Sequence, residues 1–341
     1  MEQLLPKIFD VHTDTTVLDS REIGEGIETA YKVTGSNRED YFIKFLTSGY
    51  FEPEGFICGG NLLPMLHEQE IPVPRLVYCS EANPQIGVTP YYITNFVDGK
   101  KVSGYENTEN TSIETYRSYF RNLGRYTARL HQIPVQSEVY GWAGWFNNQI
   151  EPFGGYDSFS EWVAQEVSRY GEKITESHSC YAKKDQIASL AEQIETLSLD
   201  CSDPVICTYD RKFENVILEN TVEPRAKALI DWDNPVLAPP EYMLSRIEKH
   251  YVTHPRLDSS VQYNLEKVLQ YVLEGYYRES GRGLELQNSP TYTICRIDSF
   301  VSDLRHFDRF YKDCPESTKD LVREQLFGAL ESLEKQLEQF E

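Results

Sequence analysis

Short apolar stretches separated by turn signals run through the first hundred residues. Three of them have the length and composition of β-strands: TVLDSREI (16–23), ETAYKVTG (28–35) and DYFIKFL (40–46). The segments around them that contain IGEG and GSNRED are typical of turns. Three strands joined by short turns predict an antiparallel meander.

A short helix and two more strands are predicted next. The segment from Asn61 to Glu70 fits a helix capped by Asn61, in which Pro64 would fall in the first turn. Beyond it, RLVYC (75–79) and YYITNFV (91–97) have the composition of strands, and the turn at Asp98-Gly99 follows them.

Beyond Gly99 the apolar residues recur every three or four positions, which is the period of an amphipathic helix. The pattern predicts helices at 113–133, 159–170, 185–199 and 261–277, and from Ser317 onward. The chain of 341 residues therefore predicts an α+β protein with two lobes. A small antiparallel β-rich lobe occupies 1–97, and a larger, mainly helical lobe occupies 98–341.

One part of the helical region breaks this pattern. Between residues 204 and 233, the apolar runs NVILE and AKALID lie on either side of ENTVEPR, as the two strands of a hairpin would. Asp210 precedes the first strand, Asn215 stands at its entrance, and Asp231 follows the second. A hairpin would bring these three side chains to one end.

Their chemistry suits phosphoryl transfer. The Asn215 amide and the Asp231 carboxylate are oxygen ligands of the kind that Mg²⁺ prefers. Asp210 could accept a proton from a hydroxyl, or orient that hydroxyl for attack on a phosphoryl group. Taken alone, the spacing of Asp210 and Asn215 is more typical of a turn with local hydrogen bonds, and the hairpin with Asp231 makes the two interpretations equal. Independent support is therefore needed from the β-rich lobe.

Lys44 is the basic residue of the otherwise apolar strand DYFIKFL. Such a lysine is often a surface residue whose stem lies along apolar neighbours. However, it follows a glycine-bearing turn and a strand in the order of a nucleotide-binding lobe, in which a strand lysine pairs with the α- and β-phosphates.

Charge and cysteine content narrow the partners and the compartment. The chain has 54 acidic and 33 basic residues and a formal net charge of −21, so nucleic acids and anionic membranes would be repelled. A small cation would be attracted, although an acidic surface also serves solubility alone.

The seven cysteines form no C-x-x-C pair and predict thiols of a reducing cytoplasm. No segment has the ~18 apolar residues of a membrane span.

Several motifs in order resemble the aminoglycoside phosphotransferase and choline kinase family, which has a protein-kinase-like fold. IGEGIETAYKV resembles its phosphate-covering hairpin, FIKF its lysine strand, EIPVPRLV its Pro-x-Pro strand entry and YYITNFVDG its hinge. RYTARLHQI is similar to the family helix that ends in Leu-His. TYDRKFENVIL is similar to the catalytic loop His-Gly-Asp-x-x-x-x-Asn, and LIDWDNPV to the metal-binding segment.

The resemblance implies a kinase that uses ATP or GTP with Mg²⁺ to phosphorylate a hydroxyl of a small acceptor. Asp210 would be the catalytic base or would orient the hydroxyl, and Asn215 and Asp231 would bind Mg²⁺. Asp233, two residues past Asp231, is expected to point away from it and to be a structural acid, or else a second metal contact.

The resemblance also implies a nucleotide site between the lobes. Lys44 would hold the phosphates under the turn that contains Gly26. The backbone of Asn95 and Val97 would contact the nucleobase.

The chain departs from the family pattern at four places. The phosphate-covering turn has only Gly24 and Gly26, a poor match to the G-x-G-x-x-G loop of protein kinases. Thr208-Tyr209 replaces His-Gly before Asp210, and Ala238-Pro239-Pro240 replaces a Gly-Asp-Pro motif. Where a helix glutamate would pair with Lys44, the chain has Cys58-Gly59-Gly60-Asn61, and Glu54 is the nearest upstream candidate. These departures leave two alternatives: a nucleotide-binding protein without catalysis, and a hydrolase based on the carboxylates of the LIDWDNPV segment.

Two further features have alternative interpretations. The aromatic cluster YGWAGWFNN (140–148) and Trp162 could line an acceptor pocket or pack between the lobes. His131, at the end of a predicted helix, suits a cap or a packing role. The dispersed histidines form no H-E-x-x-H zinc motif, and no G-x-S-x-G elbow indicates acyl transfer.

Overall fold

The computed structural model describes residues 1–23, 28–48, 52–81, 89–101, 116–199, 201–211, 215–219, 225–249, 265–284, 286 and 288–340. Its first sheet has five antiparallel strands in the order β1-β2-β3-β5-β4. These are β1 (Val17–Glu22), β2 (Thr29–Gly35), β3 (Asp40–Phe45), β4 (Leu76–Ser80) and β5 (Tyr91–Asn95). The predicted meander and the two later strands are confirmed.

Helix α1 (Leu5–His12) covers one face of this sheet, preceded by a short 3-10 turn at Glu2–Leu4. Strand β3 alternates as expected: Tyr41, Ile43 and Phe45 are buried against α1 and its neighbours, while Lys44 lies on the opposite face. We call residues 1–45 together with β4 and β5 the small lobe. Lys44 thus points away from the core of the small lobe.

Helix α2 (Pro53–Glu68) begins eight residues earlier than the sequence predicted. Pro53 occupies its first turn, where a missing N–H costs nothing, and Pro64 lies in the helix interior rather than in the first turn. Gly59 and Gly60 are helical as well. Tertiary packing overrides their low helix propensity, because this face of α2 is almost completely buried.

We call the described residues from 98 onward the large lobe. Its predicted helices are present as α3 (Arg117–Leu130), α4 (Phe159–Glu172), α5 (Lys184–Thr196), α7 (Leu265–Ser280) and α9 (Glu316–Leu337). The structure adds a short 3-10 turn at Tyr181–Lys183 and helices α6 (Pro240–Glu248) and α8 (Pro290–Phe310), which the sequence analysis did not predict. Helix α8 is buried on most sides, so it shows no single apolar stripe.

Two small sheets are present among the described residues of the large lobe. The first contains β7 (Tyr140–Phe146), β8 (Gln149–Tyr156), β9 (Val205–Cys207) and β12 (Val236–Ala238), in the order β8-β7-β12-β9. The second contains β6 (Lys100–Lys101), β10 (Val216–Leu218) and β11 (Ala226–Leu229), in the order β11-β10-β6. The predicted hairpin is confirmed by the antiparallel pairing of β10 with β11.

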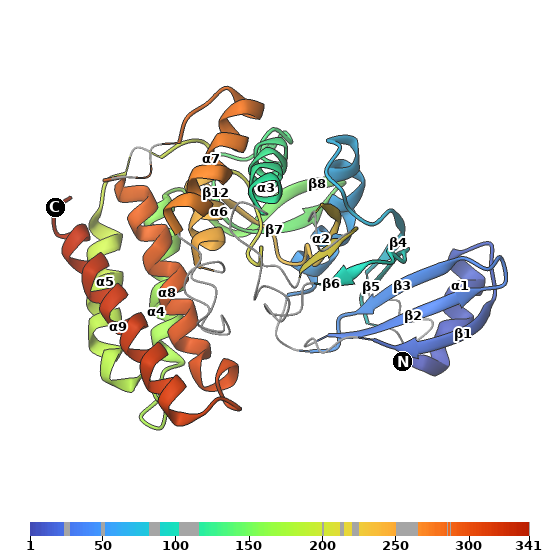
Figure 1. Cartoon of the computed structure of the whole chain (residues 1–341), viewed down its shortest axis with the longest axis horizontal. Coiled ribbons are helices and arrows are strands. Elements are labelled where there is room, and N and C mark those ends of the chain that lie inside the picture. The colour runs from blue at the N-terminus through green and yellow to red at the C-terminus, as the bar shows by residue number, and fades with distance from the viewer. Residues whose placement is uncertain are drawn as a thin grey trace.

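Figure 1 shows the small lobe at one end of the molecule and helices α4, α5, α8 and α9 at the other, with α2, α3 and the strands β7 and β8 between them. The largest core cluster contains Leu62 and Leu66 of α2 together with residues of the large-lobe helices, so α2 joins the two lobes. The division of the chain at residue 97 stays a prediction. No helix in the described ranges is long and apolar enough to cross a membrane.

Helices α3 and α7 cross with their backbones in close contact at two glycines. A Cβ atom on Gly124 would lie 1.9 Å from the carbonyl oxygen of Val272, and one on Gly275 would lie 1.9 Å from that of Arg121. Backbone atoms of a facing helix cannot rotate away as a side chain can. The crossing therefore requires glycine at both positions.

We expect Gly124→Ala to lower the free energy of unfolding by about 1–3 kcal/mol, the usual cost of forcing additional atoms into a packed interface. Gly328 in α9 provides a matched control, because no atom lies within 4 Å of its Cβ position. Gly328→Ala should be neutral, or stabilising by up to about 1 kcal/mol, because alanine favours helices. Chemical denaturation measures both changes, and equal stability of the two variants would contradict the close crossing.

Candidate active site

The candidate catalytic loop follows β9. Asp210 comes three residues after Cys207, and Asn215 precedes β10. The Asn215 side-chain Nδ2 donates to the backbone oxygen of Asp210 at 2.9 Å and to its carboxylate Oδ2 at 3.1 Å. The loop thus brings together the aspartate and the asparagine that the sequence singled out.

Asp231 lies at the same end of the β10–β11 hairpin. Strand β11 ends at Leu229, and the backbone N–H of Ile230 donates to the Asn215 carbonyl at 2.9 Å. Asp231 has a φ of 61°, in the left-handed region that non-glycine residues rarely adopt. Residues two apart on a strand share one face, so strand alternation would not have separated Asp233 from Asp231. Both carboxylates contact the amine of Lys44, and the expectation that Asp233 points away from Asp231 is wrong.

Lys44 reaches both aspartates from the small lobe. Its Nζ lies 2.7 Å from Asp231 Oδ1 and 2.5 Å from Asp233 Oδ2. Burial alone would lower the pKa of Lys44, but the two carboxylates raise it well above its ordinary value, so the amine stays charged. Burial raises the pKa of Asp233, and the Lys44 ammonium beside it opposes that rise.

Arg211 connects the catalytic loop with the segment that carries Asp231. Its Nη2 donates to the backbone oxygens of Ile230 and Asp231, both at 3.1 Å, and its guanidinium lies 4.3 Å from the centre of the Trp232 ring. Sequence reasoning did not assign this residue a role. The sequence feature that could have indicated a role is the position of this basic residue directly after Asp210.

Tyr209 occupies the place of the family glycine and connects the candidate catalytic loop with other parts of the large lobe. Its ring lies 5.6 Å from that of Trp142 in β7 and 4.2 Å from the guanidinium carbon of Arg246 in α6. Its hydroxyl is hydrogen-bonded to Ser302 of α8. A ring and a hydroxyl thus join the loop to three elements of the large lobe.

Arg246 itself is completely buried beneath the loop. It donates through Nη2 to Asp298 of α8 and, at 2.5 Å, to the hydroxyl of Tyr242. Its guanidinium carbon also lies 4.7 Å from the centre of the Tyr242 ring. The pair of Arg246 and Asp298 therefore holds two opposite charges in the core directly behind Tyr209.

The side chains of His131 and Trp162 both pack within the large lobe. His131 follows α3, with Nδ1 3.0 Å from the Tyr276 hydroxyl and Nε2 3.8 Å from the sulfur of Cys207. Burial lowers the pKa of His131 to about 3, so the ring is neutral. Trp162 is buried in the core of the large lobe, which favours packing over pocket lining.

The residues expected at the nucleotide are only partly described. Gly26 lies outside the described residues. The backbone N–H of Asn95 donates to the Arg75 oxygen at 3.0 Å, and its carbonyl accepts from Thr94 Oγ1 at 3.1 Å. Val97 follows β5 two residues later. Contact of Asn95 and Val97 with a nucleobase stays a prediction.

The donor atoms at the hairpin end fit Mg²⁺. Because Nδ2 of Asn215 is engaged by Asp210, its Oδ1 is the amide atom left for a cation. The side chain of Asp231 is 38% exposed and can be reached from solvent. The described residues contain no group of three His, Cys, Asp or Glu that could hold a metal, so an ion here would take its other ligands from water or phosphate, as Mg²⁺ does.

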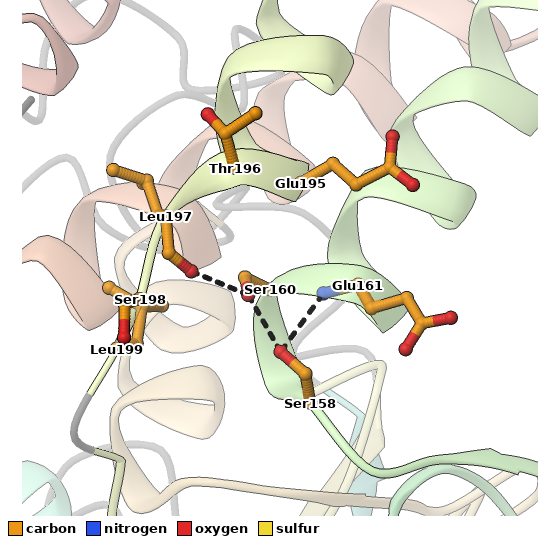
Figure 2. Close-up of a pocket in the computed structure, with 8 residues that line it drawn as sticks. All are labelled: Ser158, Ser160, Glu161, Glu195, Thr196, Leu197, Ser198 and Leu199. Carbon is orange, nitrogen blue, oxygen red and sulfur yellow. Dashed lines mark hydrogen bonds between the residues drawn. The ribbon is translucent and has the colours of Figure 1, made fainter.

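A surface groove between the start of α4 and the end of α5 lies apart from these residues. Figure 2 shows that its polar groups bond to one another: Ser158 caps α4 by accepting from the N–H of Glu161, and Ser160 donates to the Leu197 carbonyl at 3.0 Å. These hydrogen bonds serve the helix ends. The groove contains none of the candidate catalytic residues.

Solved structures with the same fold cover nearly the whole chain. A candidate aminoglycoside phosphotransferase from Ralstonia eutropha has a TM-score of 0.65 and 14% identity, with 98% of both chains covered. Amicoumacin kinase hAmiN, in complex with AMP-PNP, Ca²⁺ and its ligand, has a TM-score of 0.62 and 12% identity over 97% of this chain and 93% of that one. Spectinomycin phosphotransferase APH(9)-Ia, in complex with ADP and spectinomycin, has a TM-score of 0.56 and 16% identity over the same shares.

These similarities confirm the two-lobe, protein-kinase-like α+β fold. A search of curated protein sequences found no match. A family model described as the phosphotransferase enzyme family matches residues 19–256, which include every candidate site residue. The chain belongs to the phosphotransferase enzyme family.

Proposed function

We propose that this protein is a small-molecule kinase that transfers the γ-phosphoryl group of ATP or GTP to a hydroxyl of a small acceptor. The observation that supports it is the meeting of Lys44 from the small lobe with Asp231, at the hairpin end that also holds Asn215 and Asp210. Family membership supports a phosphotransferase in general.

In this proposal the candidate site residues divide the work of phosphoryl transfer. Asp210 accepts the proton of the acceptor hydroxyl or aligns that hydroxyl for in-line attack. Asn215 keeps the Asp210 carboxylate in place through its Nδ2. Lys44, which is held charged by its two carboxylate partners, binds phosphate oxygens of the nucleotide.

Asn215 and Asp231 would hold Mg²⁺, which supplies positive charge against the phosphate oxygens when it is bound. Arg211 keeps the Asp231 backbone against the catalytic loop, so the base and the metal ligands belong to one connected unit. The nucleotides bound in the structures of amicoumacin kinase and spectinomycin phosphotransferase support a nucleotide donor.

The acceptor is proposed only as a chemical class. The similar proteins include structures with spectinomycin and with kanamycin, which are hydroxylated compounds. The formal net charge of −21 would favour a cationic acceptor such as an aminosugar or amino alcohol.

A screen of acceptors tests the function. The purified protein would be incubated with Mg-ATP or Mg-GTP and a panel of aminoglycosides, amino alcohols and sugars, and both nucleoside diphosphate and phosphorylated acceptor would be measured. We expect acceptor-dependent formation of both products. Consumption of nucleotide that is independent of acceptor and unchanged in Lys44→Ala would favour the hydrolase alternative instead.

The catalytically silent alternative makes a different prediction. Nucleotide would raise the melting temperature, but no acceptor in the panel would be phosphorylated. A protein that is neither stabilised by nucleotide nor active with it would contradict the kinase and the silent alternative together.

A further inference from the structure

The two carboxylates that contact Lys44 differ in their surroundings. The side chain of Asp231 is 38% exposed, whereas that of Asp233 is 5% exposed. Only the first can readily change partners when a ligand arrives from solvent. The Asp233 side chain is buried and has little access to solvent.

Asp233 is also held at its other oxygen. Tyr92 of β5 donates from its hydroxyl to Asp233 Oδ1 at 3.2 Å. Tyr92 is the cross-strand partner of Lys44, so the two side chains lie next to each other on one face of the sheet. The rings of Phe42 and Phe56 pack against Tyr92. One oxygen of Asp233 therefore faces the lysine and the other faces its neighbour in the sheet.

Helix α2 fixes the backbone around Asp233 without offering a carboxylate of its own. A Cβ on Gly59 would lie 2.8 Å from Asp233 Cα and 2.7 Å from the Trp232 oxygen. The Gly55 carbonyl accepts from the N–H of Asn234 at 3.2 Å. Glu54 is the nearest glutamate upstream of the position where a helix glutamate would pair with Lys44. It is exposed, and its Cβ lies next to Gly144 of β7.

We propose that Asp233 is the positioning residue that holds Lys44 for the nucleotide, in the role that a helix glutamate has in protein kinases. Tyr92 fixes its second oxygen, and the glycine face of α2 fixes its backbone. This inference rests on the proposed function, because it gives Lys44 a phosphate to bind. The two acids then have different roles: Asp231 is the proposed metal ligand, and Asp233 positions the Lys44 side chain.

The competing role for Asp233 is a second metal ligand. The two roles differ in what they predict without any metal. A positioning residue restrains Lys44 in the empty protein, whereas a metal ligand acts only when the ion is bound.

The first experiment measures the labelling rate of each lysine by reductive methylation and mass spectrometry, in EDTA and without nucleotide. We expect Asp233→Asn to raise the rate at Lys44 by about tenfold, the change expected when a buried hydrogen bond to a charged group is lost. The exposed Lys312 is the internal control and should not change. Gly59→Ala should act in the same direction, whereas Gly328→Ala should not.

The second experiment measures the affinity for Mg-ADP in a double-mutant cycle with Lys44→Ala. If Asp233 acts through Lys44, Asp233→Asn weakens binding in the wild-type background and has no further effect in Lys44→Ala. An unchanged labelling rate at Lys44, or an Asp233→Asn effect that persists in Lys44→Ala, would overturn the inference and favour a metal ligand.

The role of Asp233 and the proposed function can fail separately. If the wild type binds Mg-ADP but Asp233→Asn changes neither measurement, the role of Asp233 is wrong and the proposed function stands. If the wild type binds no nucleotide at all, the proposed function is wrong and the role of Asp233 falls with it.

Discussion

Replacement of Asp210 by alanine is expected to reduce phosphoryl transfer by about 10²–10⁴-fold, the usual contribution of a positioned general base. Binding of Mg-nucleotide should remain nearly unchanged, because the proposed phosphate and metal contacts come from Lys44, Asn215 and Asp231. Asp231→Ala should impair both transfer and Mg-dependent nucleotide binding. Turnover measured with the best acceptor, together with calorimetric titration of Mg-ADP, separates the two effects.

A matched control is available at Asp313, an aspartate between α8 and α9 whose side chain is 88% exposed. Asp313→Ala should leave both turnover and binding unchanged. Similar, near-wild-type rates in Asp210→Ala and Asp231→Ala would reject the kinase mechanism.

The second large effect concerns the buried pair behind the catalytic loop. We expect Asp298→Ala to destabilise the protein by about 3–5 kcal/mol, because it leaves the Arg246 guanidinium charged and without its counter-ion in the core. Arg246→Met should have a similar cost, since Asp298 then loses its cation. Chemical denaturation monitored by circular dichroism measures the change.

The double variant Arg246→Met with Asp298→Leu tests the reason for that cost. It should recover most of the lost stability, because both charges and their desolvation are removed together. The exposed pair of Lys319 and Glu316 provides a control, and Lys319→Ala should change stability by less than about 1 kcal/mol. A double variant as unstable as the sum of the two single variants would contradict this explanation.

The strands of the small lobe and the hairpin near Asp231 could be predicted from sequence because local patterns determine them. Alternating apolar residues with turn signals specify β1, β2 and β3, and the pairing of β10 with β11 follows from two apolar runs around a turn. The hairpin geometry then brings Asn215 next to the residue before Asp231.

Long-range contacts decide the features that sequence did not predict. The start of α2 at Pro53 depends on glycines that pack against the Trp232–Asn234 backbone, a contact that no local pattern reveals. The direction of Asp233 is seen in its contacts with Lys44 and Tyr92, which are remote from it in the sequence. Helix α8 is buried on most sides and so has no amphipathic period to detect.

Arg211 has a mechanical consequence for the site. By holding the carbonyls of Ile230 and Asp231 from the position next to Asp210, it sets the spacing between the two acids within the large lobe alone. Lys44, in contrast, is carried by the small sheet. Any relative displacement of the two lobes would therefore move Lys44 relative to Asp231 and leave the distance between Asp210 and Asp231 unchanged.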